Sequence, residues 1–176
     1  MAKKLFVIMF LSIIVLNLSS CAFIPLFDNS DEENVFTVKT QMKNDCKEII
    51  RCLEEKDSDT LKNMFCEKLL NNYENIDEDI EQAMVFFQGN ITSYGNVLYG
   101  DDDSFINGEC VKFSASPIID PITTDSGKEY SIVYNEHIID VENPEKIGIS
   151  YIEICDENNN SCQILDFYVV NPDHHW

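Results

Sequence analysis

The sequence contains few basic residues. It has 12 lysines and arginines against 32 aspartates and glutamates, for a formal net charge of −20 at pH 7. A surface this acidic repels the phosphates of nucleic acids and the headgroups of anionic lipids, so we expect neither as a ligand. The commonest meaning of such charge is solubility, and an acidic docking surface for a basic partner is the alternative interpretation.

Two further features are missing. No Cys-x-x-Cys motif occurs, which leaves zinc binding and thioredoxin-type redox chemistry without support. The apolar stretch at residues 5–16 ends at Asn17, short of the roughly 20 apolar residues that a membrane-spanning helix needs. We therefore expect no metal site, no cofactor and no spanning helix, although an uncleaved membrane anchor is the alternative for this stretch.

The first 20 residues have the organisation of an export signal, with Lys3 and Lys4 ahead of the apolar stretch. The Leu-Ser-Ser-Cys sequence at residues 18–21 resembles the bacterial lipobox, in which one apolar and two small residues precede a cysteine. The resemblance implies cleavage before Cys21 and acylation of its thiol, and two acyl chains hold a protein stably on a membrane. We predict a lipid-anchored protein facing the extracytoplasmic side of the cell membrane. An ordinary signal peptide with an incidental thiol is the alternative.

The predicted organisation has one folded domain. Residues 1–20 are the signal peptide, 21–30 the lipidated tether, 31–172 a single α+β domain, and 173–176 a tail. About 150 residues remain after cleavage, which fits one domain.

Six cysteines remain besides Cys21, an even number that permits disulfides in an oxidising compartment. Cys155 and Cys162 flank a polar loop between two strand patterns, so we predict that they face each other across a hairpin. Cys46 and Cys52 are expected on one helix, too far apart to bond each other. Either could pair with Cys66 or Cys110, or all four could be buried thiols.

Hydrophobic periodicity predicts helices first and strands afterwards. Helices are expected at about residues 28–53, 59–69 and 77–88, and strands at about 91–99, 110–118, 130–140, 149–155 and 163–170. Turn signals at Asn107-Gly108, Ser126-Gly127 and Asn143-Pro144 separate the strands. This order is typical of an α+β domain with a mostly antiparallel sheet.

Three stretches, at residues 86–94, 122–134 and 142–154, resemble Gram-positive lipoproteins of the family called domain of unknown function 5104. That family is similar to the nuclear transport factor 2-like superfamily, in which three helices and a curved sheet form a cone. The resemblance implies three N-terminal helices packed on a curved sheet. It also implies a possible homodimer, because superfamily members often dimerise through the sheet. It supplies no catalytic motif.

Several side chains are candidates for a pocket or an exposed face. On the strand at 130–140, alternation places Tyr130, Tyr134 and Glu136 on one face and His137 on the other. If Cys155 opposes Cys162, a mixed face forms on the last two strands, and it carries Tyr151, Glu153, Asp166 and Tyr168. Acid-base catalysis needs its groups within hydrogen-bond reach of one substrate, which this pattern does not require. We therefore assign no catalytic residue.

The sequence Asp101-Asp102-Asp103-Ser104 is rich in ligands for a hard cation. It lacks the glycine and the closing glutamate of a calcium loop, so we predict a solvated acidic turn. The favoured hypothesis for the whole protein is a non-catalytic, membrane-tethered accessory domain that binds an unknown small molecule or envelope protein. The alternatives are an enzyme that uses the cone cavity and an acidic, immunity-type partner of another envelope protein.

Overall fold

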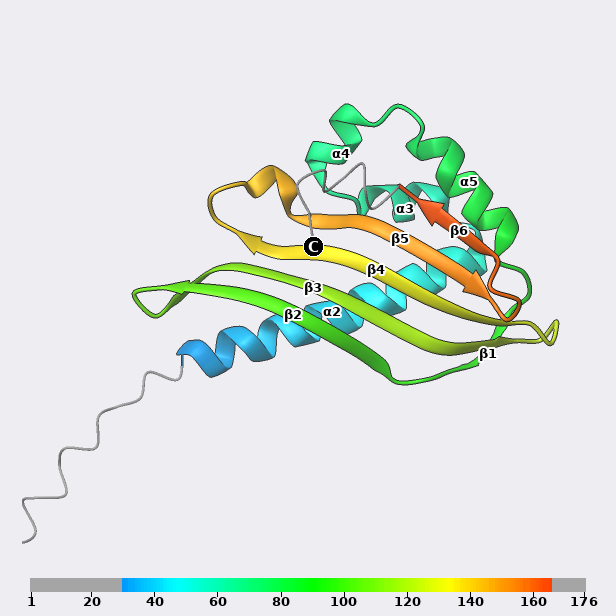
Figure 1. Ribbon diagram of the computed structural model, residues 1–176, viewed down its shortest axis with the longest axis horizontal. Coiled ribbons are helices and arrows are strands. Elements are labelled where there is room, and N and C mark those ends of the chain that lie inside the picture. Colours follow the sequence, from blue (N-terminus) through cyan, green and yellow to red (C-terminus); the bar gives the residue numbers. More distant parts are fainter. Residues whose placement is uncertain (1–29, 166–176) are drawn as a thin grey trace, which may run out of the picture. The chain divides into compact units, whose positions relative to one another are not determined.

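The computed structural model describes residues 30–165, with side chains from residue 37 onward. The chain divides into two units, Met1–Ser30 and Asp31–Trp176, and the second contains the fold. Its helices are α2 (Ser30–Glu55), α3 (Ser58–Asn63), α4 (Glu67–Asn72), α5 (Ile76–Phe86) and the short 3₁₀ helix η2 (Pro144–Lys146). Its strands are β1 (Ile91–Tyr94), β2 (Val97–Ile106), β3 (Glu109–Thr124), β4 (Glu129–Asp140), β5 (Gly148–Asp156) and β6 (Ser161–Ile164) (Figure 1).

The strands form one antiparallel sheet in the order β1-β3-β4-β5-β6. β2 pairs with β3 as well, along the same edge as β1. Asn107 and Gly108 connect β2 to β3 with φ values of +55° and +84°, as the tightest hairpin turns require. The α+β class and the mostly antiparallel sheet are confirmed.

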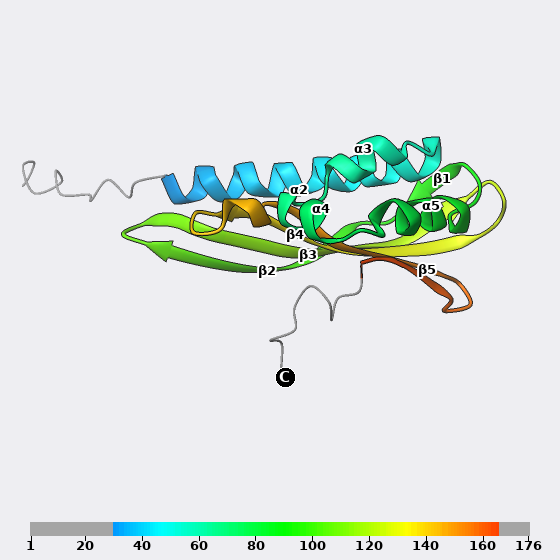
Figure 2. The same cartoon turned by 90° about the horizontal axis from the view of Figure 1, so that it is seen from above.

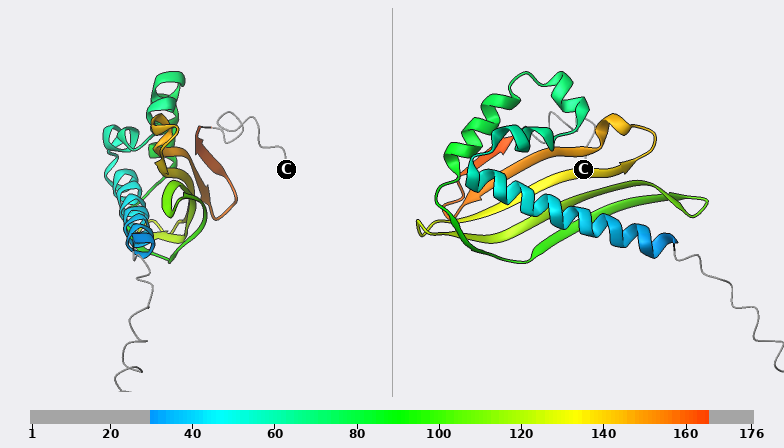
Figure 3. Two further views of the ribbon diagram at one scale, coloured as in Figure 1. Left: turned by 90° about the vertical axis from the view of Figure 1, so that its left-hand side faces the viewer. Right: turned by 180° about the vertical axis from the view of Figure 1, so that it is seen from behind.

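The helices pack on one face of the sheet, as Figure 2 shows from above. α2 crosses the strands on this face (Figure 3), and its Cys46, Ile49 and Leu53 are buried against the sheet at three- and four-residue spacing. Between α2 and the sheet lies a continuous apolar core. Its strand residues include Ile119, Ile122, Ile132, Tyr134, Ile152, Ile154 and Ile164.

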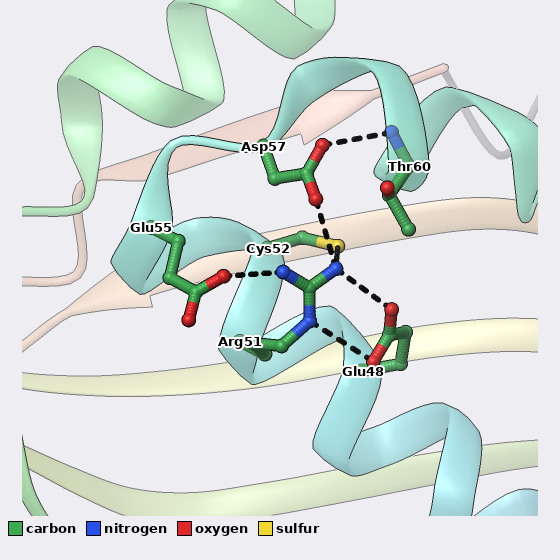
Figure 4. Close-up of polar contacts among 6 residues, drawn as sticks. All are labelled: Glu48, Arg51, Cys52, Glu55, Asp57 and Thr60. Atoms are coloured by element: carbon green, nitrogen blue, oxygen red, sulfur yellow. Dashed lines mark hydrogen bonds and ion pairs between the residues drawn. The ribbon is translucent and has the colours of Figure 1, made fainter.

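Arg51 joins the end of α2 to the start of α3 (Figure 4). Its guanidinium binds Glu48 at 2.8 Å and Asp57 at 2.9 Å, and it also contacts Glu55. Asp57 in turn accepts a hydrogen bond from the backbone N–H of Thr60 at 3.1 Å. One cation therefore holds the carboxylate that caps α3.

The helical region differs from the sequence prediction, because the expected helix at 59–69 is two short helices. Residues 64–66 leave the helix and bond to β5 instead: the Cys66 N–H donates to the Ile149 carbonyl, and the Ile149 N–H donates to the Met64 carbonyl, both at 2.9 Å. Gly148, with φ +118°, allows this close approach, because a Cβ there would lie 3.0 Å from the Met64 carbonyl oxygen. Backbone hydrogen bonds to β5 have thus replaced the bonds of a helical turn.

The strand region has two corrections. The expected strand at 91–99 is divided into β1 and β2, and Asp101, Asp102 and Asp103 lie within β2 rather than in a turn. The predicted last strand at 163–170 begins within β6, which ends at Ile164, and residues 166–170 lie outside the described part. Between residues 30 and 165, no helix combines the length and apolar character needed to cross a bilayer.

Candidate functional site

The sheet face opposite α2, which we call the open face, carries small polar side chains at its centre. In β3 the alternation places Phe113 and Ala115 in the core and Lys112, Ser114 and Ser116 on the open face. The neighbouring strands continue these rows. Asp102 of β2 and His137 of β4 both pair with Ser114, and the Ser116 row continues into Gly100 and Asn135.

A pocket of about 370 Å³ lies at this place, at the small end of the range of about 300–1,000 Å³ usual for ligand sites. Its side-chain groups come from β2, β3, β4 and β5. The polar residues that line it on the open face are Asp102, Lys112, Ser114, Ser116, Asn135, His137 and Ser150. Gly100 also lines the pocket, and a Cβ added there would meet nothing within 4 Å.

Hydrogen bonds orient the polar groups around Asn135. The Ser116 hydroxyl donates to Asn135 Oδ1 at 2.6 Å, and the Ser150 hydroxyl donates to the Asn135 carbonyl at 3.3 Å. Ser150 is the extra residue at an irregularity in the β4-β5 register, where Asn135 pairs with Tyr151 but Glu136 pairs with Ile149. The bulge directs the Ser150 side chain to the pocket.

His137 lines the pocket as a neutral ring. Burial lowers its pKa, and the nearby positive charges of Lys112 and Lys146 lower it further, while Asp140 opposes this shift. Its Nδ1 is buried without a hydrogen-bond partner in the described part of the chain. A buried N–H without an acceptor is the costlier arrangement, so the ring hydrogen belongs on Nε2.

Comparison with known proteins identifies the family of this chain. The family model "Domain of unknown function (DUF5104)" matches residues 48–157, more than half of the sequence. The chain belongs to the DUF5104 family. No curated protein matches it. The match runs from α2 through β5, so it includes most of the open-face pocket but not β6.

Within this DUF5104 domain, the candidate residues predicted on β4 lie on two different faces of the sheet, as the alternation of side chains along a strand requires. Tyr130, Tyr134 and Glu136 face the helices and are buried, and His137 faces the pocket. Tyr130 accepts a hydrogen bond from the Gln88 N–H at 3.0 Å and donates to the Phe86 carbonyl at 3.2 Å. It therefore stabilises the end of α5.

Tyr134 and Glu136 form a polar cluster under α2. The Tyr134 hydroxyl donates to the Met42 carbonyl at 3.2 Å and lies 3.0 Å from Cys46 Sγ. Burial and, to a smaller extent, the adjacent Asp45 carboxylate together raise the pKa of Glu136 to about 8. Burial also raises the pKa of Asp45. At neutral pH Glu136 is therefore protonated and donates a hydrogen bond to Asp45, while its Oε1 has no partner within the described residues.

The last two strands have a different register from the one assumed. Cys155 pairs with Ser161, and Cys162 pairs with Ile154, so the two cysteines occupy opposite faces. Both thiols are free, and the predicted disulfide between them is wrong. Cys46, Cys52 and Cys66 are free and buried, which agrees with the thiol alternative for these three.

Of the mixed face predicted on these strands, only part can be located. The Tyr151 hydroxyl donates to Glu153 Oε2 at 2.9 Å, and Gln163 Nε2 donates to Glu153 Oε1 at 2.9 Å. Gln163 pairs with Glu153 and therefore lies on the same face as Tyr151 and Glu153. Asp166 and Tyr168 lie outside the described residues, as does Cys21.

Sequence reasoning missed most of the pocket. Lys112, Ser114 and Ser116 alternate with buried residues, a pattern that marks one polar face of a strand. That pattern alone could have identified the β3 contribution. Among the described residues, no cluster of histidine, cysteine and carboxylate side chains could hold a metal ion.

Proposed function

We propose that the protein is a lipoprotein, acylated at Cys21 and facing the extracytoplasmic side of the cell membrane. Its DUF5104 domain is then a non-catalytic binding domain that takes a small polar ligand in the open-face pocket. The observation that carries the binding role is the convergence of polar side chains from four strands on one hollow of about 370 Å³. The Leu-Ser-Ser-Cys sequence at residues 18–21 supports the anchor.

The positions of the titratable groups favour binding over catalysis. Burial raises the pKa of Glu136 and lowers the pKa of His137. The Glu136 side chain is directed to Asp45 beneath α2, whereas His137 lies on the opposite side of β4, so the two side chains are not arranged as a general acid-base pair. The space between α2 and the sheet, where a cone cavity would lie, is occupied by Ile49, Leu53 and Ile132.

We also assign the domain to the nuclear transport factor 2-like architecture. Helices on one face of the sheet support this assignment. Register irregularities in four of the strand pairs support it too, because bulges bend a sheet. A homodimer formed through the open face would cover the pocket. Sedimentation of the full chain in detergent, with and without ligand, distinguishes a dimer interface from a ligand site.

The anchor is tested by labelling cells with radioactive palmitate. We expect label on the protein and none on the Cys21→Ala variant. The Cys155→Ala variant is the matched control, because it removes another thiol and should keep the label. An unlabelled wild-type protein contradicts the anchor.

The pocket is tested by filling it. Gly100→Val adds a side chain where space is open and suits a strand. In a thermal-shift screen of the full chain with polar metabolites, we expect ligands that stabilise the wild-type protein and leave Gly100→Val unchanged. Ligands that stabilise both proteins equally bind elsewhere and contradict the proposal.

An acidic partner surface is the second candidate. Asp101, Asp102 and Asp103 lie on an exposed strand in a protein of net charge −20. Long-range attraction of this kind favours basic proteins and weakens with salt. Salt-sensitive retention of one basic envelope protein, lost in an Asp103→Asn variant, would favour this function over the pocket, because Asp103 does not line the pocket.

A further inference from the structure

Two opposite charges at the pocket remain separate. Lys112 on β3 pairs across the sheet with Ser104, and Asp102 lies two residues from Ser104 on β2. Lys112 and Asp102 are therefore diagonal neighbours on one face, about 7–8 Å apart between Cα atoms, which long side chains can bridge. Within residues 37–165, no ion pair joins Lys112 to Asp102, or to Asp140, which pairs with Lys112 from β4.

Lys112 is distinguished by its place and not by the lack of an ion pair. Among residues 37–165, Arg51 and Lys62 form ion pairs, and no other ion pair joins two of these residues. Lys112 instead lines a pocket beside the Ser114 hydroxyl and the neutral His137 ring. These groups present hydrogen-bond donors, as an anionic group requires.

The neighbouring strand β2 supplies an acceptor. Asp102 lines the pocket from β2 and is exposed, so its carboxylate is available to a cationic group. Asp103, the next residue, pairs with buried Phe113 and projects to the other face. The pocket thus has a cation-binding side at Asp102 and an anion-binding side at Lys112.

Resting on the proposed binding function, we propose that the open-face pocket binds a small zwitterion with a carboxylate close to a primary ammonium group, as in free amino acids and short peptides. The carboxylate contacts Lys112, Ser114 and His137, and the ammonium contacts Asp102. A simple anion in the pocket would be repelled by Asp102, and a simple cation would be repelled by Lys112, because neither ligand carries a second charge that offsets the repulsion. A neutral sugar would leave both charges partly desolvated and unpaired.

The test uses isothermal titration calorimetry on the full chain in detergent micelles. The probes are the common amino acids and glycylglycine, followed by the N-acetyl and the amide derivative of the best ligand. The variants are Asp102→Asn and Lys112→Gln. Their matched controls are Asp103→Asn, on the same strand but the other face, and Lys43→Gln, exposed on α2.

We expect at least one amino acid or glycylglycine to bind. Asp102→Asn and Lys112→Gln should each weaken its affinity about tenfold or more, because each removes a charged hydrogen bond. Asp103→Asn and Lys43→Gln should leave the affinity unchanged. Both derivatives should bind about tenfold or more weakly, since each lacks one of the two charges.

The outcomes separate this inference from the function on which it rests. If a simple anion or a sugar binds, no zwitterion does, and Gly100→Val abolishes the binding, then the zwitterion is wrong and the pocket function stands. Binding of zwitterions that Gly100→Val leaves intact contradicts both. Failure of every amino acid and of glycylglycine to bind to a folded protein overturns the zwitterion directly.

Discussion

Glu136 on β4 donates a hydrogen bond to the carboxylate of Asp45 on α2, and the two residues form an acid pair beneath the helix. Glu136 is 3% exposed. Because Glu136 is buried and lies beside the Asp45 carboxylate, it keeps its proton at a pH where a free glutamate is ionised. The pair therefore connects the stability of the α2–β4 contact to pH.

The first prediction concerns this connection. Glu136 has a folded-state pKa of about 8, raised from an ordinary value of 4.5. Between these values the folded state holds a proton that the unfolded state has released, so the stabilisation is present at low pH and is lost as pH rises towards 8. Urea unfolding at pH 5, 7 and 9 should show Glu136→Gln losing less stability over this range than the wild type.

The control for this prediction is Asp45→Asn. Removal of its charge lowers the pKa of Glu136, because the Asp45 carboxylate is one cause of the rise. The pH dependence should then move to lower pH instead of disappearing. Equal slopes for wild type and Glu136→Gln would mean that Glu136 is not a buried acid.

The second prediction separates packing from ligand binding at the tyrosines. Tyr134→Phe should lower the free energy of unfolding by about 1 kcal/mol, because the Met42 carbonyl and the Cys46 thiol lose their partner. Tyr130→Phe should cost a similar amount through the end of α5. Neither variant should change ligand affinity at the pocket. If either variant changed the ligand affinity without changing the stability, the ligand would bind on the sheet face that the helices cover and not on the open face.

The third prediction concerns the thiols. Cys46, Cys52, Cys66, Cys155 and Cys162 are free, so all five should be alkylated in denatured protein without a reductant. Burial raises the pKa of Cys46 and Cys52 to about 11. Because the thiolate is the reactive form, these two should react more slowly in folded protein than Cys155 and Cys162. Peptide mass mapping gives both results, and a Cys155–Cys162 disulfide would contradict the register of β6.

The fourth prediction compares two glycines. Gly148→Ala should lower the free energy of unfolding by about 1–3 kcal/mol, since it forces a side chain into φ +118° and against the backbone of residues 64–66. Gly100→Ala, in open space, should stay within about 0.5 kcal/mol of the wild type. Chemical denaturation measures both. Equal effects would mean that residues 64–66 do not contact β5 as described.

Sequence periodicity predicted the long elements well. The first helix and the strand at 130–140 agree with α2 and β4 to within a few residues, because each buries one regular face over many residues. The break at residues 64–66 was missed, since it depends on bonds to Ile149, which is more than 80 positions away. Local patterns carry no information about such a partner.

The site was harder to predict than the fold. His137 was located correctly relative to Tyr134 and Glu136, because strand alternation determines which residues share a face. The pairing of Cys155 with Cys162 was wrong by one residue of register, which reverses the face of a strand residue. The pocket itself requires four strands in register, so Lys112 and Asp102 could not be connected from the sequence.

The location of Asp101, Asp102 and Asp103 on β2 affects how readily the protein associates with other copies of itself. β2 pairs only with β3 among the described strands, so its other side has unpaired backbone groups that could add a strand from another molecule. Two such edges meeting antiparallel would bring the aspartates of both molecules together, and their repulsion opposes fibril-like stacking. Acidification removes this repulsion, so the protein should self-associate more readily as its carboxylates take up protons.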